Sequence, residues 1–285
     1  MTLLADPGVA VAHRLTDAER AAFERDGFLL LRQVLDPERR SALLRAAERL
    51  DAEYRAEPGV TPHHVCNRHD LIEADDAFLD LVDLPTVFPK VFGILGWNIQ
   101  LFHTQLVVTP PAPAGAPAGG YGWHQDNNRM NLDFETPPPH PRVSVKVGYF
   151  LTDLPRPGMG NLCVVPGSHR LGRPDVPLGE QPPGATEVTA AAGDAILFDR
   201  RIWHAASTNT SDTTRVFLTY GYSYRWLRPK SRMQHDALFA RCDPVRRQLL
   251  GAAPTGANGY FDPADEDVPL RGWIRAHLGD GAVTP

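Results

Sequence analysis

Hydrophobic and polar positions follow two different spacings, which divide the chain near residue 98. In the first part, Thr16 with Glu19 three residues later forms the pattern of a capping box and predicts a helix. Asp36-Pro37 predicts the start of a second helix, which runs to about Arg55 because alanines and leucines recur on one stripe. Beyond residue 98, short apolar or alternating runs predict strands over residues 99–108, 143–151, 162–165, 195–198 and 216–224.

The predicted strands are separated by turns rich in glycine and proline, which favours a sandwich or jelly roll over alternating strand–helix units. Residues 57–70 and 109–121 are predicted loops, the second because it consists almost entirely of proline, alanine and glycine. We therefore expect a mainly β fold with flanking helices. It forms one domain over residues 1–285, with a helical part at about 15–97, a β core at about 98–228 and a C-terminal extension at about 229–285.

Composition narrows the class of protein. The 285 residues are 42% hydrophobic and 22% charged, which is ordinary for a globular protein and excludes a disordered or fibrous chain. A net charge of −5 argues against a general nucleic-acid or membrane-surface binder. No apolar run approaches the roughly 20 residues of a membrane span. Three cysteines without CxxC spacing, and a start without a signal-peptide pattern, predict a cytoplasmic protein.

The residues that carry chemistry are Trp123-His124-Gln125-Asp126 and, 78 residues beyond Asp126, His204 after Trp203. In an extended segment residues i and i+2 project to one face, so His124 and Asp126 can reach the same point. A second imidazole from a distant strand would complete the two-histidine, one-carboxylate set that binds iron in non-haem Fe(II) oxygenases. The alternative is that His-x-Asp occurs here by chance and that these histidines are structural.

Arg215 lies eleven residues after His204, at the start of a predicted strand. An Fe(II) oxygenase needs an electron-donating co-substrate, usually 2-oxoglutarate, whose distal carboxylate requires a buried cation. Arginine offers a planar fork that holds a carboxylate through two hydrogen bonds. The alternative for Arg215 is a structural ion pair with a local carboxylate such as Asp212.

These motifs occur in the order and spacing of a known family. Together with Gly27-Phe28-Leu29, Tyr149-Phe150-Leu151, Pro166-Gly167-Ser168-His169 and Gly193-Asp194, they resemble the phytanoyl-CoA dioxygenase family of Fe(II)/2-oxoglutarate oxygenases over most of residues 15–228. The resemblance implies a double-stranded β-helix core and O2 as the second co-substrate. It also implies iron on His124, Asp126 and His204, and 2-oxoglutarate anchored by Arg215.

Two further residues are candidate co-substrate contacts. Gln105 resembles a family position whose side chain touches 2-oxoglutarate near the metal, although an amide satisfied within a sheet is an equal alternative. Lys146 alternates with Val145 and Val147, so it points to the face opposite the valines. A lysine that points into a β core needs an anion, and family members place a lysine near the co-substrate.

The chain departs from the family pattern two residues after His204. Many members have serine there, and this chain has Ala206. The hydroxyl that often assists the arginine is then either absent or supplied by another residue, for example Thr219 or Tyr220.

Asn127-Asn128-Arg129 follows the expected ligand Asp126 directly and should lie beside the metal. Two amides and a guanidinium would suit a polar, hydroxyl-rich small-molecule substrate, whereas the alternative is an ordinary solvated loop. Within the family, this tilts the prediction toward a natural-product intermediate rather than an acyl-CoA.

The sequence therefore predicts an Fe(II)/2-oxoglutarate-dependent dioxygenase that forms succinate while oxidising a small polar molecule. Hydroxylation, ring closure and desaturation all remain open, as does the oligomeric state. The carboxylate of Asp126 argues against a halogenase, which has a small residue at that position. A non-catalytic cupin-like binding module is the alternative of a different class, and a nucleic-acid demethylase is disfavoured by the net charge.

Overall fold

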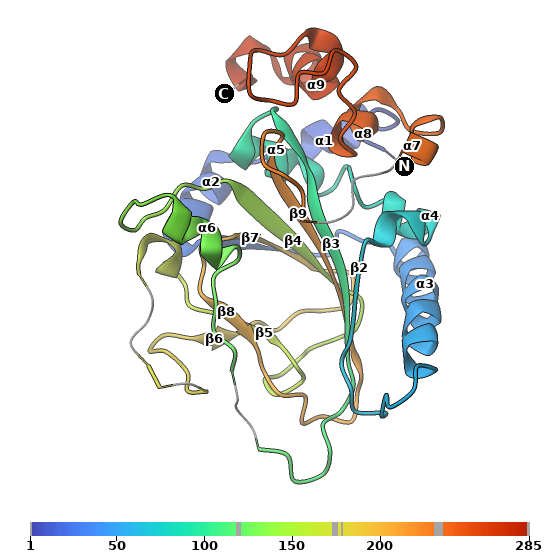
Figure 1. The fold of residues 1–285 in the computed structure, drawn as a ribbon, viewed down its shortest axis with the longest axis vertical. Coiled ribbons are helices and arrows are strands. Elements are labelled where there is room, and N and C mark those ends of the chain that lie inside the picture. Colours follow the sequence, from blue (N-terminus) through green and yellow to red (C-terminus); the bar gives the residue numbers. More distant parts are fainter. Residues whose placement is uncertain (1, 118–120, 173–175, 178, 231–235, 284–285) are drawn as a thin grey trace.

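Two antiparallel sheets face each other in the computed structural model, which describes residues 2–117, 121–172, 176–177, 179–230 and 236–283. Within these residues the larger sheet has the strand order β1-β7-β4-β9-β3-β2 and the smaller one β6-β5-β8 (Figure 1). The strands are β1 Phe28–Leu31, β2 Cys66–His69, β3 Ile99–Thr109, β4 Ser144–Phe150, β5 Leu162–Val164, β6 Thr186–Glu187, β7 Ala195–Asp199, β8 His204–Ala206 and β9 Arg215–Tyr224. This arrangement confirms the predicted β core with flanking helices.

The helices begin where the sequence signals lie. Thr16 caps α2 in a complete capping box with Glu19, and Asp36 caps α3 directly before Pro37. The helices are α1 Pro7–Ala12, α2 Asp17–Asp26, α3 Pro37–Arg55, α4 Asp76–Leu79, α5 Phe88–Leu95, α6 Asn128–Asp133, α7 Asp236–Phe239, α8 Pro244–Leu249 and α9 Pro269–Leu278.

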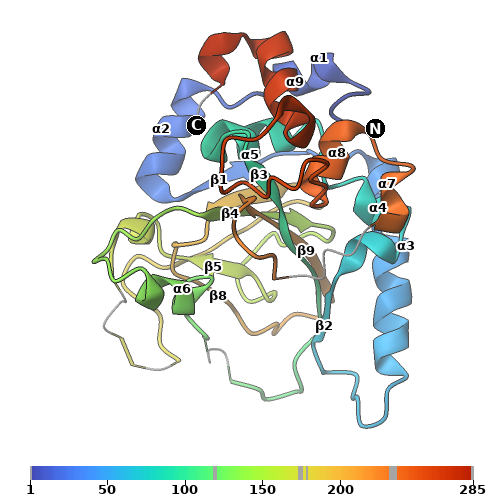
Figure 2. The same cartoon turned by 45° about the horizontal axis from the view of Figure 1, so that its top comes forward.

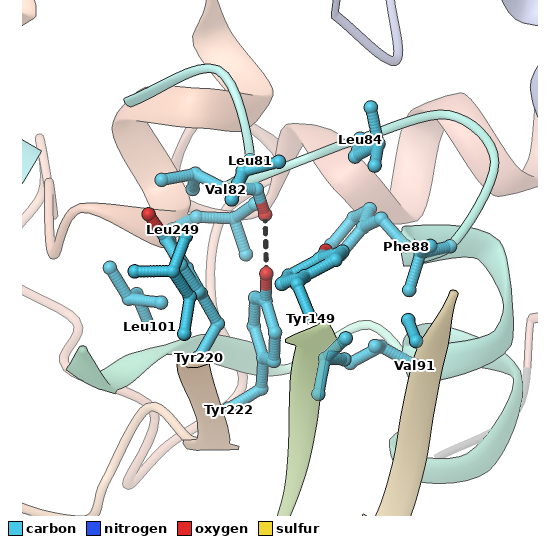
Figure 3. Packing of buried hydrophobic residues seen from close by; sticks show 14 of the residues in the cluster. Leu81, Val82, Leu84, Phe88, Val91, Leu101, Tyr149, Tyr220, Tyr222 and Leu249 are labelled. Carbon is cyan, nitrogen blue, oxygen red and sulfur yellow. Dashed lines mark hydrogen bonds between the residues drawn. The ribbon is translucent and has the colours of Figure 1, made fainter. Parts of the chain in front are cut away.

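The main hydrophobic core lies between the helices and the outer face of the larger sheet. Figure 2 shows α5, α8 and α9 over this sheet, although α5 lies in the first third of the chain and the other two lie near its C-terminus. Tyr220 and Tyr222 project from β9 into this layer, and the Tyr222 hydroxyl donates to the carbonyl of Val82 over 2.8 Å (Figure 3). The core runs from Leu3 to Ile274, so both ends of the chain contribute to one buried cluster.

The inner face of the larger sheet turns toward the smaller sheet. Val145 and Val147 are fully buried against the helices, whereas Lys146 between them points inward, as the alternation predicted. Phe198 and Phe217 project from β7 and β9 into the second hydrophobic cluster. The polar residues that carry the predicted chemistry lie beside this cluster, since the ring centroids of Phe198 and His204 are 5.3 Å apart.

One predicted loop is partly wrong. Residues 57–70 contain β2, Cys66–His69, which pairs with β3 so that His69 lies opposite Gln105. Its only fully buried side chain is Cys66, and the other three are polar. An edge strand needs few apolar residues because one of its sides is not covered by another strand. The hydrophobic pattern therefore could not reveal it.

Gly148 in β4 has no room for a Cβ unless a neighbouring side chain moves. A Cβ there would lie 2.2 Å from the Cζ of Phe217. We expect Gly148→Ala to lower the free energy of unfolding by about 1–3 kcal/mol, because overpacking displaces the Phe217 ring. Urea denaturation measures this loss. Gly272→Ala is the matched control: it lies in α9 with open space around it, so it should leave stability unchanged or raise it by about 0.5–1 kcal/mol.

Among the described residues no helix has the length and apolar character needed to cross a membrane.

Candidate active site

The two predicted histidine ligands lie opposite each other across an antiparallel bridge. The amide of His124 donates to the carbonyl of His204, and the amide of His204 donates to the carbonyl of His124, each over 3.0 Å. Their ring centroids are 4.3 Å apart. Main-chain pairing between residues 80 positions apart therefore brings both imidazoles to one place.

Asp126 completes the cluster, as its spacing from His124 predicted. One ligand atom each from His124, Asp126 and His204 lies within 4.8 Å of the others, and Asp126 Oδ2 is 3.8 Å from His204 Nε2. No other such group of metal-ligating side chains is found among the described residues. The three residues thus form the facial set of two imidazoles and one carboxylate.

Main-chain carbonyls orient both imidazoles. His124 Nδ1 is 2.8 Å from the carbonyl oxygen of Gly122, and His204 Nδ1 is 2.9 Å from that of Ile202. A carbonyl oxygen can only accept, so each Nδ1 carries the proton and each Nε2 keeps a free lone pair. This is the tautomer in which a metal-binding histidine is normally held.

Lys146 holds one oxygen of the Asp126 carboxylate and leaves the other free. Its Nζ lies 2.7 Å from Asp126 Oδ1, whereas Asp126 Oδ2 is buried and accepts no hydrogen bond from the described residues. Burial opposes ionisation of Asp126, but Lys146 and the two imidazoles outweigh it and hold the pKa of the carboxyl well below its usual value. The anion that Lys146 was predicted to need is thus, in this structure, the carboxylate of Asp126.

His204 is also prepared for a cation. Burial lowers the pKa of His204 to about 4, against the opposing effect of the Asp126 carboxylate. The imidazole is therefore neutral at pH 7, and a metal ion would not have to displace a proton from it.

Arg215 is a buried cation without a counterion in the described part of the chain. Its side chain lies at the start of β9 with 3% of the residue exposed, and its Cζ is 4.5 Å from the centroid of the Phe217 ring. Among the described residues its Nε has no hydrogen-bond partner, and neither Asp212 nor another carboxylate forms an ion pair with its guanidinium. Burial lowers the pKa of Arg215 to about 10. The local ion pair considered from the sequence is therefore wrong, and the guanidinium lacks the anion that its burial demands.

Gln105 lies on the same inner face. Its amide nitrogen donates to Asn67 over 2.8 Å, and its carbonyl oxygen accepts from the Thr219 hydroxyl over 3.3 Å. The Thr219 hydroxyl is thus on the correct face to replace the missing family serine. Tyr220, the other suggested replacement, is not: it faces the helices and its hydroxyl donates to the carbonyl of Phe78.

The residues after Asp126 begin a helix, α6, and not the solvated loop that was the alternative to a substrate contact. Asn127 occupies the N-cap position of α6 with a left-handed backbone (φ 56°) and without a capping hydrogen bond from its side chain. Of Asn128 only the main chain belongs to the described structure. The side chain of Arg129 is 83% exposed and pairs with Asp133 one turn later. The structure therefore keeps Asn127 beside the ligands but turns Arg129 to solvent and a local partner.

Sequence reasoning missed His103, which is buried on the inner face. In the strand register His103 and Lys146 lie on either side of Gly221. Burial, with Lys146 and Lys230 nearby, lowers the pKa of His103 to about 3, so the imidazole is neutral. Alternation along residues 99–108 could have placed His103 with Gln105, but a bulge at Phe102 made its face depend on the pairing.

A groove of about 400 Å³ opens beside His124. Two indoles, from Trp123 and Trp203, line it together with Asn131 and the exposed Leu132. Aromatic faces combined with amides are typical of sites for small ligands that carry both rings and polar groups.

Two charged groups without partners among the described residues indicate which ligands the residues between the sheets can bind. Asp126 Oδ2 is an ionised oxygen without a donor among the described residues, next to two imidazole lone pairs, and so fits a divalent cation. Arg215 is a buried guanidinium to which the described part of the chain offers no anion, and so fits a carboxylate. Fold and site together define a non-haem iron, 2-oxoglutarate-dependent dioxygenase.

The chain belongs to the Phytanoyl-CoA dioxygenase (PhyH) family, whose pattern matches residues 23–217. The ectoine dioxygenase of Nocardia farcinica is 27% identical over 233 residues, which cover 70% of this chain and 76% of that protein. The ectoine dioxygenase of Bordetella parapertussis is 25% identical over 261 residues, covering 79% and 82%.

Two solved structures have a similar fold. HygX from Streptomyces hygroscopicus, with nickel and 2-oxoglutarate bound, superposes with a TM-score of 0.59 at 19% identity, covering 76% of this chain and 90% of that one. SnoN, the non-heme alpha ketoglutarate dependent epimerase from nogalamycin biosynthesis, superposes with a TM-score of 0.54 at 21% identity, covering 77% and 85%. Both confirm the predicted class of fold.

Proposed function

We propose that this dioxygenase hydroxylates, or oxidatively cyclises, a small polar natural-product intermediate while 2-oxoglutarate is converted to succinate. The observation that carries the proposal is a pair of buried charges, Asp126 Oδ2 and the Arg215 guanidinium, that find no partner in the described part of the chain. One calls for a cation and the other for an anion, and Fe(II) with 2-oxoglutarate supplies both.

His124, Asp126 and His204 would hold the iron through two Nε2 atoms and Oδ2. Iron with 2-oxoglutarate and O2 supplies the oxidant that removes a hydrogen from the substrate, so the protein's task is binding and orientation. The carbonyls of Gly122 and Ile202 keep the imidazoles aimed at the metal. Lys146 keeps Asp126 Oδ1 occupied, so Oδ2 is the oxygen that would be left to hold the metal.

Arg215 would anchor the distal carboxylate of 2-oxoglutarate through its fork, with Phe217 packed against the guanidinium. Gln105 and Lys146 would contact the end of the co-substrate that lies nearer the metal. Lys146 has three donor hydrogens and uses one on Asp126, so it can serve the carboxylate and the co-substrate together.

Three features support a polar substrate. Asn127 directly follows the predicted ligand Asp126, so Asn127 and Asn128 would border the metal, and the neutral imidazole of His103 adds a polar group to the inner wall. The groove beside His124 combines indoles with the Asn131 amide. The relatives include ectoine dioxygenases, and the structural neighbour HygX was solved with hygromycin B bound. Ectoine and hygromycin B are both small polar molecules.

The first test needs no substrate. With Fe(II), 2-oxoglutarate and O2 alone, we expect the purified protein to form succinate slowly, because iron and co-substrate suffice for uncoupled turnover. Succinate is measured by mass spectrometry, with the metal-free protein as control. If folded protein that holds Fe(II) formed no more succinate than the control, the assignment as an oxygenase would be excluded. A cupin-like binding module would then be the remaining interpretation.

The class of substrate can be determined with a panel of candidate compounds in the same succinate assay. Ectoine, an aminoglycoside and an acyl-CoA are added in turn, and a true substrate accelerates succinate formation and O2 uptake together. Acceleration by the acyl-CoA but by neither polar compound would replace our proposal with an acyl-CoA hydroxylase.

We also propose that residues 1–285 act as one domain in the cytoplasm. The continuous core from Leu3 to Ile274 supports a single domain. Cys66, Cys163 and Cys242 are all buried and unpaired, which suits a reducing compartment.

A further inference from the structure

Both main-chain polar groups of Asp126 bind to Arg200, a residue that directly follows β7. The amide of Asp126 donates to the Arg200 carbonyl over 2.9 Å, and Arg200 Nη1 lies 3.3 Å from the Asp126 carbonyl oxygen. The same Nη1 donates to Asn131 Oδ1 over 2.8 Å, and Nη2 donates to the carbonyl of Pro141 over 2.7 Å. One guanidinium thus joins three segments of chain around a predicted iron ligand.

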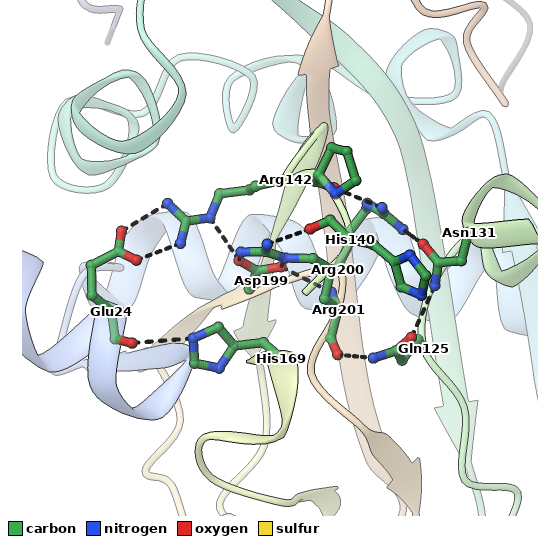
Figure 4. Close-up of polar contacts among 10 residues, drawn as sticks. Glu24, Gln125, Asn131, His140, Arg142, His169, Asp199, Arg200 and Arg201 are labelled. Carbon is green, nitrogen blue, oxygen red and sulfur yellow. Dashed lines mark hydrogen bonds and ion pairs between the residues drawn. The ribbon is translucent and has the colours of Figure 1, made fainter. Parts of the chain in front are cut away.

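The charge of Arg200 is not used in a close ion pair with any described residue. Arg200 is fully buried, and all its hydrogen bonds go to uncharged oxygens. The neighbouring arginines behave differently: Arg201 and Arg142 both pair with Asp199 at 2.7 Å, and Arg142 also pairs with Glu24 (Figure 4). A buried guanidinium without a counterion is costly for stability alone.

The segment that Arg200 holds is tied down a second time. Asn131 donates to Gln125 Oε1 over 2.9 Å, and the Gln125 amide donates to the carbonyl of Arg201 (Figure 4). Lys146 fixes Asp126 Oδ1 from the opposite strand. Main chain and side chain of Asp126 are therefore restrained separately, which leaves Oδ2 facing His204.

We propose that Arg200 is a positioning residue for the metal centre. It sets the main chain of Asp126 so that Oδ2 faces the two imidazoles before a metal ion arrives. The inference rests on the proposed iron site, but it concerns the affinity of that site and not the reaction.

Arg200→Lys tests the proposal because a lysine keeps the charge but cannot reach Asp126, Asn131 and Pro141 from one nitrogen. The Fe(II) dissociation constant is measured by titration without O2, on protein shown to be folded by circular dichroism. We expect Fe(II) to bind about 10- to 100-fold more weakly, as found when the outer partners of metal ligands are removed.

Arg201→Lys is the matched control. Arg201 is a buried neighbour whose side chain contacts Asp199 and His140, so the variant should keep the wild-type Fe(II) affinity. Thermal unfolding with and without Fe(II) separates positioning from general stability. A purely structural role would lower both melting temperatures equally, whereas loss of positioning reduces the rise that Fe(II) produces.

Asn131→Ala provides a second variant if Arg200→Lys does not fold. It removes one of the three acceptors of the Arg200 guanidinium and the tie to Gln125 without changing a metal ligand, and it should also weaken Fe(II) binding. Wild-type Fe(II) affinity in a folded Arg200→Lys, or in Asn131→Ala where the first does not fold, overturns the inference. A wild-type protein that binds no Fe(II) overturns the proposed function instead, so the two failures are distinguishable.

Discussion

Arg215→Leu should weaken 2-oxoglutarate binding by about 30- to several-thousand-fold, which corresponds to roughly 2–5 kcal/mol for an unpaired buried charge. The variant removes the fork and leaves the distal carboxylate facing Phe217 and the apolar interior. Iron binding should survive, because Arg215 contacts none of the three predicted ligands. The 2-oxoglutarate dissociation constant is measured by anaerobic titration of the Fe(II)-loaded protein.

Arg215→Lys is the graded control for this prediction. It keeps a cation on β9 but loses the paired hydrogen bonds, so its affinity for 2-oxoglutarate should lie between those of the wild type and Arg215→Leu. The stability of the variant without co-substrate provides an independent test. Since the guanidinium is buried without an anion, Arg215→Leu should not destabilise the free protein, and the leucine variant can be the more stable one. An unchanged 2-oxoglutarate affinity would return Arg215 to a structural role.

Asp126→Gly should abolish coupled turnover and weaken Fe(II) binding by more than the roughly 10- to 100-fold that loss of an outer partner costs. The facial geometry needs all three ligands, and the carboxylate supplies the only negative charge among them. Chlorination should not simply appear, because an open position does not by itself bind and orient chloride. Metal content and succinate yield measure the effect.

Lys146 affects the stability of the Asp126→Gly variant, and this effect calls for a control variant. With the carboxylate gone, the ammonium of Lys146 is left in a site where only 11% of its side chain is exposed. The double variant Asp126→Gly/Lys146→Met removes both charges and should recover the stability that the single variant loses. Full iron occupancy and normal turnover in either folded variant would show that Asp126 is not a ligand.

Much of the framework could be predicted because its signals are local. The Thr16 capping box, the Asp36-Pro37 start of α3 and the strand at 99–108 each depend on residues a few positions apart. The inward direction of Lys146 followed from simple alternation. Polar short strands lacked such a signal: β2 became a strand only because β3 offered it an edge.

The candidate site also combines features that the sequence predicts with features that only the fold decides. By itself, the sequence determined the residue types, the i and i+2 spacing of His124 and Asp126, and the presence of an arginine beyond His204. Only the tertiary structure decided their partners. It paired Lys146 with Asp126, exposed Arg129, and placed Arg200 behind Asp126. Those contacts depend on which strands and loops become neighbours. Strand register and burial decide which segments become neighbours, and both depend on residues that are tens of positions apart. The spacing of residues along the chain gives information only about residues a few positions apart.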